Sequence, residues 1–335
     1  MSQTRPHGFQ VLALSGGGFR GAYTARILAD IESELGGRPI ATCFDLIAGT
    51  SIGGILALAL ALEIPAVKMV ELFDRHGEEI FKKRWSLGGL LRAPYSPEPL
   101  RKLLEGVDLF GDRLLGACKH PVIIPSINYS SGQPVLFKTP HHDDFRRDHL
   151  HRVVDIALAT SAAPAYFPRH QFNNCQYVDG GLYANAPGLL ALHEAEHFFK
   201  ADRDDIWVMS IGTMSSKFTV NPAQGHRGGA IDWGNNWPLQ MPKRLFGLSI
   251  SVQESLSHFI LKHKLGQRFL HIDDELNDER ARVVALDRAD QFAKQALFSA
   301  AVERSKACIS NPDFRTFLAH SPAKAVFFYG ENKNG

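Results

Sequence analysis

Short apolar runs alternate with helical patterns along this chain, and several of the runs end in glycine. Residues 10–14 form the first run, which ends in a serine and three glycines. The segment 22–35 follows with apolar residues at three- to four-residue spacing, which predicts a helix that ends at a glycine pair. Residues 44–48 form a second apolar run, which leads through another glycine turn into a helix from about Ile52. Two such strand–turn–helix units predict a parallel sheet with covering helices.

The same pattern predicts further buried strands and amphipathic helices in the rest of the chain. The expected strands are 122–127, 135–138, 176–178 and 206–211. The expected helices are 67–81, 150–160, 189–199, 249–265 and 291–308. Because no internal repeat or clear linker interrupts this order, we expect one α/β domain over residues 1–335.

Composition and charge narrow the class of protein. The 335 residues are 44% hydrophobic and 21% charged, with a formal net charge of +2. These values exclude a disordered chain, a collagen-like chain and a small disulfide scaffold. A near-zero net charge also argues against a partner that is a nucleic acid polymer.

The spacing of the cysteines and the length of the most apolar segment predict the cellular compartment of the protein. The four cysteines lie far apart with no CxxC pair, so neither a zinc site nor a disulfide framework is expected, and a reducing cytoplasm fits. The first ten residues lack the apolar core of a signal peptide. The most apolar segment, 52–62, ends at Glu63, well short of the ~20 residues that span a bilayer. We therefore expect a cytoplasmic protein that contacts a membrane only peripherally.

A candidate nucleophile stands at the second glycine turn. Gly49, Ser51 and Gly53 match the G-x-S-x-G pattern between a predicted strand and a predicted helix. In that context the serine sits on a tight turn with its hydroxyl exposed above the sheet. A serine that merely caps the helix would produce the same letters.

A glycine-rich loop follows the first strand and suits an anion. Consecutive glycines before a helix present backbone N–H groups with no side chain in the way, and the oxyanion of a tetrahedral intermediate is such an anion. Arg20 could add positive charge there. The same letters fit a dinucleotide-binding loop, but no acidic residue ends the second strand, where a ribose would need one. The loop consists of Gly16, Gly17, Gly18, Phe19, Arg20 and Gly21.

A candidate base ends the predicted strand 176–178. Asp179 is followed by Gly180 and Gly181, and a carboxylate at a strand tip can serve as the sole base for a serine. An Asp-Gly turn without catalytic role would look the same. A hydrolase triad is the other alternative, completed by one of three candidate histidines, His193, His197 and His258.

Taken in order, these three motifs resemble the patatin-like phospholipase family over residues 11–213, and the segment 159–168 also looks like that family's conserved stretch before the aspartate. The resemblance implies a three-layer α/β/α sandwich with a mainly parallel sheet, followed by a helical extension over 245–335. It implies a Ser–Asp dyad that hydrolyses acyl esters of lipids through an acyl-enzyme, without metal or cofactor. Ser51 would be the nucleophile and Asp179 the base. The oxyanion hole would consist of the Gly17 and Gly18 amides with Arg20.

A narrower resemblance extends nearly end to end. Segments 10–28, 43–54, 137–142 and 317–335 are similar to the patatin phospholipase effectors of bacterial CBASS anti-phage systems. That resemblance implies activation by a cyclic dinucleotide such as cyclic GMP-AMP, followed by degradation of the cell membrane, and self-association on activation is a further hypothesis. Cyclic dinucleotides need cations and aromatic faces, although an ordinary solvated basic loop offers the same residue types. Suitable residues are Lys138, His141, His142, Arg146, Arg147, Trp233, Trp237, Lys243 and Arg244.

An enzyme that acts on phospholipids also needs access to a bilayer. The loop 85–99 combines apolar and basic side chains, which predicts a membrane-contacting patch. An active-site lid and simple core packing are the alternatives for the same loop. The residues concerned are Trp85, Leu87, Leu90, Leu91 and Tyr95, with Arg84 and Arg92 beside them.

Overall fold

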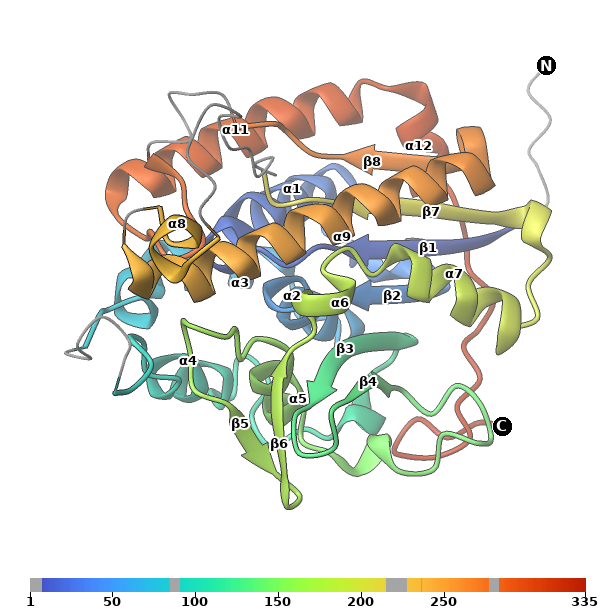
Figure 1. The fold of residues 1–335 in the computed structure, drawn as a ribbon. Coiled ribbons are helices and arrows are strands. Elements are labelled where there is room, and N and C mark those ends of the chain that lie inside the picture. Colours follow the sequence, from blue (N-terminus) through green and yellow to red (C-terminus); the bar gives the residue numbers. More distant parts are fainter. Residues whose placement is uncertain (1–7, 85–90, 215–227, 236, 277–282) are drawn as a thin grey trace.

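The structure is a computed structural model that describes residues 8–84, 91–214, 228–235, 237–276 and 283–335. A mixed eight-stranded sheet runs through its centre in the order β5-β6-β3-β2-β1-β7-β8, and β4 also pairs with β3 (Figure 1). The strands are β1 (Phe9–Leu14), β2 (Leu46–Gly49), β3 (Val122–Asn128), β4 (Gln133–Lys138), β5 (His170–Phe172), β6 (Cys175–Asp179), β7 (Ile206–Ile211) and β8 (Phe269–Ile272).

Five neighbouring strands form the parallel part of the sheet. Strands β3, β2, β1, β7 and β8 pair in parallel, whereas β4 and β6 are antiparallel to β3 and β5 is antiparallel to β6. The mainly parallel sheet expected from the strand–turn–helix units is therefore confirmed. Its antiparallel part consists of β4, β5 and β6, which join the sheet through β3.

Helices cover both faces of this sheet, which gives the three-layer α/β/α sandwich. On one face, Leu12 and Leu14 of β1 join the larger core, whereas Val11 and Ala13 join a second core on the other face. The larger core includes residues of α1 (Gly21–Glu34), α2 (Ile52–Ala61), α3 (Ala66–Ile80), α4 (Glu98–Leu104), α5 (Val153–Thr160), α11 (Gln291–Ile309) and α12 (Pro312–Leu318). The second face carries α7 (Gly188–His197) and α9 (Met241–Leu265), which cross the strands in Figure 1, and the short helices α6 (Gly181–Ala184) and α8 (Ala230–Trp233) pack on α9.

Helix α2 is the core helix that its apolar sequence predicts. Every residue from Ile52 to Ala61 is buried, so the helix has no polar face. Among the helices that the structure describes, none is both long enough and apolar enough to cross a bilayer.

The structure corrects the expected elements at several places. Helix α9, expected from residue 249, begins at Met241, and the short helices α4 and α12 were not expected. The helix expected from residue 150 begins at Val153, after a 3₁₀ turn over Asp148–Leu150. The segment 245–335, expected to be a helical extension, also contains β8, which joins the sheet beside β7. Strand β5 was not expected at all. Both missed strands are short and half exposed, so they carry no apolar run for a sequence pattern to detect.

A buried glutamine joins the start of the sheet to the last helix of the chain. The Gln10 side chain donates hydrogen bonds to the carbonyls of Cys43 (2.7 Å) and Phe317 (2.8 Å). Because both acceptors are buried, removing the donor leaves two carbonyls without it. This contact fixes α12 against the edge of the larger core.

We predict that Gln10→Ala lowers the free energy of unfolding by roughly 1 to 3 kcal/mol, because the buried Cys43 carbonyl loses this donor, whereas the Phe317 carbonyl still accepts from the amide of His320. Urea unfolding followed by circular dichroism measures this change. The control is Gln133→Ala at an exposed position of β4, which should leave stability unaltered. Equal effects of the two substitutions would contradict the structural role of Gln10.

Candidate active site

The turn between β2 and α2 holds Ser51 in a conformation that few residues other than glycine adopt. Ser51 has φ 56°, and α2 begins at the next residue. A Cβ on Gly49 would lie 2.1 Å from the Gly53 carbonyl oxygen, and a Cβ on Gly53 would lie 2.3 Å from the carbonyl oxygen of Leu14. Glycine is thus required at both positions, because the start of α2 lies close to Gly49 and the end of β1 lies close to Gly53. This is the local geometry expected of a nucleophile turn.

Ser51 and Asp179 form a direct hydrogen bond. The Ser51 hydroxyl donates to Oδ2 of Asp179 at 2.7 Å, and Oδ1 of Asp179 accepts from the amide of Gly181 at 2.7 Å. The Ser51 side chain makes no hydrogen bond that caps α2, so the helix-capping alternative is wrong. The predicted nucleophile and base are therefore adjacent, although 128 residues separate them in the chain.

The environment of Asp179 favours a base that works near neutral pH. Burial raises the pKa of this carboxyl to about 7, while hydrogen bonds from Ser51 and Gly181 act in the opposite direction. A base is most effective when its pKa lies near the working pH. A histidine is not needed to supply that property here.

Two backbone amides of the glycine loop are available for an oxyanion. The amide of Gly16 donates to the Asn185 carbonyl (3.0 Å) and that of Phe19 donates to the Leu286 carbonyl (2.8 Å). Between them, the amides of Gly17 and Gly18 have no acceptor among the described residues, and both glycines line the same cavity as Ser51. Preorganised amides of this kind stabilise the negative charge of a tetrahedral intermediate.

Arg20 is not placed as the sequence suggests. Its guanidinium donates to the carbonyls of Met214 (3.0 Å) and Gly17 (3.5 Å), and Arg20 is absent from the cavity lining. Burial lowers the pKa of Arg20, while the nearby charges of Glu254 and Asp273 raise it. The expectation that Arg20 contacts the oxyanion is corrected. Its guanidinium instead binds the carbonyl of Gly17 in the glycine loop and that of Met214.

A polar network from α9 supports the same loop. Asn185 donates to the carbonyl of Gly16 (3.1 Å) and to Oε1 of Glu254 (2.7 Å), and the Thr213 hydroxyl donates to the Gly16 carbonyl at 3.1 Å. Burial raises the pKa of Glu254 to about 7, which the charge of Arg20 opposes. Sequence reasoning missed Asn185 and Glu254. The available signal was that Glu254 is the sole acidic residue in the helix from Met241 to Leu265.

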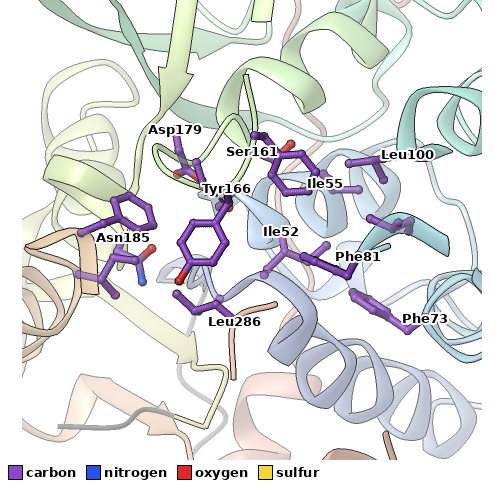
Figure 2. A pocket seen from close by; sticks show the side chains of 18 of the residues that line it. Ile52, Ile55, Phe73, Phe81, Leu100, Ser161, Tyr166, Asp179, Asn185 and Leu286 are labelled. Carbon is purple, nitrogen blue, oxygen red and sulfur yellow. Dashed lines mark hydrogen bonds between the residues drawn. The ribbon is translucent and has the colours of Figure 1, made fainter. Parts of the chain in front are cut away.

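A narrow apolar cavity extends from the dyad. It holds about 60 Å³, well below the roughly 300 Å³ at which pockets for drug-sized ligands begin. Figure 2 shows apolar side chains from several elements converging on this space beside Asp179. The apolar lining includes Ile52, Ile55, Leu72, Phe73, Ile80, Phe81, Leu100, Tyr166, Phe167, Phe246, Ile250 and Leu286. Such a lining suits a hydrocarbon chain, which it could admit at full length only after the walls move apart.

Three polar side chains join separate segments close to this cavity. The Tyr95 hydroxyl (2.8 Å) and the Lys243 ammonium (2.9 Å) both donate to Oδ2 of Asp287. Lys243 also lies 4.4 Å from the centre of the Tyr166 ring, which lines the cavity. Tyr95 is fully buried, so it is wrong to count it in an exposed membrane patch. Trp85, Leu87 and Leu90 of that expected patch lie outside the described residues, and Leu91 is exposed.

The candidate histidines lie elsewhere in the fold. His193 and His197 are exposed and stack on each other along α7. His258 packs against His271, and burial together with the charge of His271 lowers its pKa to about 3. None of the described residues that line the cavity is a histidine. The geometry therefore favours a dyad over a triad.

The residues considered for a nucleotide do not form one cluster. Lys138 and His141 are paired with the buried carboxylate of Glu194, at 2.6 Å and 3.0 Å, and so have a structural role. Trp233, Lys243 and Arg244 lie on α8 and α9 instead. In the described part of the chain, the one cluster of metal-ligating type is His142 with Asp143 and Asp144, and none of the three lines the cavity.

Comparison with known proteins agrees with the site. Residues 12–192 match the family profile described as patatin-like phospholipase, and the chain belongs to this family. A Pseudomonas aeruginosa protein named cGAMP-activated phospholipase is 43% identical over 97% of this chain and 96% of its own length. Proteins of the same name from Escherichia coli (35% identical, 86% of each chain) and Vibrio cholerae (33% identical, 87% of this chain and 88% of that one) are also similar.

We predict that Asp179→Asn lowers kcat/KM for a short-chain p-nitrophenyl ester by roughly 10²- to 10⁴-fold, because the amide cannot accept the proton of Ser51. In the parent protein, kcat/KM should rise as the pH increases through about 7, where Asp179 loses its proton. Asp112→Asn, at an exposed aspartate, is the matched control. Full activity of Asp179→Asn, or a profile flat between pH 5 and 9, would contradict the assignment of the base.

We also predict that His193→Ala, His197→Ala and His258→Asn each keep kcat/KM within roughly threefold of the parent value, because a Ser–Asp dyad uses no imidazole. The measurement is the same ester assay, with thermal unfolding to confirm that each variant is folded. A loss of about 10³-fold or more in one folded variant would favour a triad instead.

Proposed function

We propose that this chain is a phospholipase that hydrolyses acyl esters of membrane phospholipids through Ser51 and Asp179. The observation that carries the proposal is the 2.7 Å hydrogen bond between these two side chains at the end of an apolar cavity. Membership of the patatin-like phospholipase family supports the same substrate class. Residues 1–335 then act as one patatin-like domain, with the three motifs within 11–213.

The residues account for both halves of an acyl transfer. The Ser51 oxygen attacks the ester carbonyl as Asp179 accepts its proton, and the oxyanion that forms is held by the Gly17 and Gly18 amides. Collapse of this intermediate expels the alcohol, which takes the proton from Asp179. Water then attacks the acyl-enzyme while Asp179 again accepts a proton, and the fatty acid leaves as Ser51 recovers its hydrogen.

We infer that a cyclic dinucleotide such as cyclic GMP-AMP activates this hydrolysis. Three relatives that each match more than four-fifths of the chain carry the name cGAMP-activated phospholipase. The narrow cavity supports the inference, since a space of about 60 Å³ has to widen before a fatty acyl chain enters. Degradation of the cell's own membrane in anti-phage defence, with transient contact at its inner surface and self-association on activation, completes the proposal.

The two alternative functions have less support. A non-catalytic nucleotide-binding loop does not explain the hydrogen bond between the Ser51 hydroxyl and the Asp179 carboxylate. A triad esterase would need a histidine beside the dyad, and the described cavity lining contains none.

We predict that purified protein releases fatty acid from phospholipid vesicles in the presence of cyclic GMP-AMP, and at least about tenfold more slowly in its absence. Ser51→Ala should abolish release under both conditions while the protein remains folded. A fluorophosphonate probe should label the parent protein and not Ser51→Ala. Equal rates with and without the nucleotide would refute the activation, whereas release by Ser51→Ala would refute the nucleophile.

A further inference from the structure

Helix α9 exposes an apolar stripe along most of its length. Leu245, Val252, Leu256 and Phe259 are between 40% and 61% exposed, and their spacings of seven, four and three residues place them on one side of the helix. Leu248 lies between them and lines a shallow surface groove with Leu245 and Val252. The opposite side of the helix is buried. Contiguous exposed apolar surface of this kind marks a contact with a partner or a membrane.

The charged residues of α9 are mostly basic, which favours an anionic partner. From Met241 to Leu265 the sole acidic residue is Glu254, which is buried on the inner side. Basic residues stand at both ends of the helix, with Arg244 near its start and Lys262 and Lys264 near its end, whereas Lys243 is paired with Asp287. Two copies of the stripe, packed in either direction, would bring basic ends together, which like-charge repulsion disfavours. Anionic lipid headgroups complement both ends.

Two tryptophans extend this surface beyond the start of α9. Trp233 at the end of α8 is 46% exposed and Trp237 is 57% exposed. Arg244 ties Trp233 to the helix, because its Nε donates to the Trp233 carbonyl at 2.9 Å. Tryptophan favours the boundary between headgroups and hydrocarbon, so its place beside the stripe fits a lipid surface better than a purely polar partner.

The same helix forms part of the cavity wall. Phe246 and Ile250 point inward from α9 and line the cavity that contains Ser51. A bilayer bound to the outer side would thus lie one helix away from the dyad. At the start of α9, Lys243 pairs with Asp287 near the cavity, whereas Leu245, two residues later, is exposed.

We propose that α9 with the two tryptophans is the surface by which this protein docks on an anionic phospholipid bilayer. The α9 surface is defined by Trp233, Trp237, Leu245, Val252, Leu256 and Phe259. The proposal rests on the proposed phospholipase function for the choice of a bilayer as occupant, and it adds the place and orientation of the contact. It places the membrane contact on α9 and not on the loop 85–99.

Vesicle flotation tests this surface without hydrolysis. The parent is full-length Ser51→Ala, mixed with phosphatidylcholine vesicles containing about a third phosphatidylglycerol, with and without cyclic GMP-AMP. Adding Val252→Glu or Leu256→Glu should lower the partition coefficient at least about tenfold, because a carboxylate replaces an apolar side chain that enters the interface. Val107→Glu, at a valine that is 85% exposed after α4, is the matched control and should float like the parent.

Further measurements separate the outcomes. Thermal unfolding establishes that each glutamate variant is folded, and tryptophan fluorescence of the parent should shift to the blue on vesicles. Flotation of Val252→Glu and Leu256→Glu at the parent level would overturn the proposal. The proposal would also be overturned if these variants changed the oligomeric state measured by light scattering but floated like the parent. The α9 surface would then bind a second copy of the chain. A third outcome is that the α9 surface binds vesicles but the protein with Ser51 intact hydrolyses no phospholipid. That outcome would refute the proposed function and leave the docking surface standing.

Discussion

The close approach of the β2–α2 turn to the end of β1 is the constraint on which the rest of the site depends. Leu14 and Gly49 are register partners in adjacent parallel strands, so both chains leave the sheet at the same edge. The space between them is small enough that Gly53 is held against the Leu14 carbonyl. The loop that follows β1 therefore has to pass beside Ser51. Ser51 lies beside the amides of Gly17 and Gly18 because β1 and β2 are adjacent in the sheet. Helix α1 connects the end of β1 to the start of β2.

The antiparallel part of the sheet supplies the third element. Ala48 pairs with Ile123, whereas Asp179 pairs with Ser126, three residues further along β3. Strand β3 thus extends beyond the end of β2, and β6 runs back beside that extension. Asp179 is placed above the turn in this way, and Gly181 binds its second oxygen. A fully parallel arrangement of β6 would carry the end of that strand in the opposite direction, away from Ser51.

The sequence predicts the features that depend on neighbours in the chain. Apolar runs and glycine turns identify β1, β2 and α2, and the motif resemblance pairs Ser51 with Asp179 across more than a hundred residues. What it misses depends on packing between distant segments. Strand β8 has one fully buried residue, Ile272, so no pattern distinguishes it from a loop. The direction of Arg20 follows from where the Met214 carbonyl lies, and the burial of Tyr95 follows from the position of Asp287. Neither the direction of Arg20 nor the burial of Tyr95 can be predicted from the amino-acid sequence pattern alone.

The burial of Asp179 has a consequence for the whole molecule. Because burial raises its pKa to about 7 from an ordinary value near 4, the unfolded chain gives up this proton at lower pH than the folded chain. Ionisation of Asp179 therefore lowers the stability of the folded state as the pH rises from about 4 towards 7, and ionisation of buried Glu254 acts in the same direction. Two extensive apolar cores offset that loss. The ionisation that makes Asp179 a base is thus also a step that costs the fold stability, so activity and the contribution of this carboxyl to stability change in opposite directions with pH.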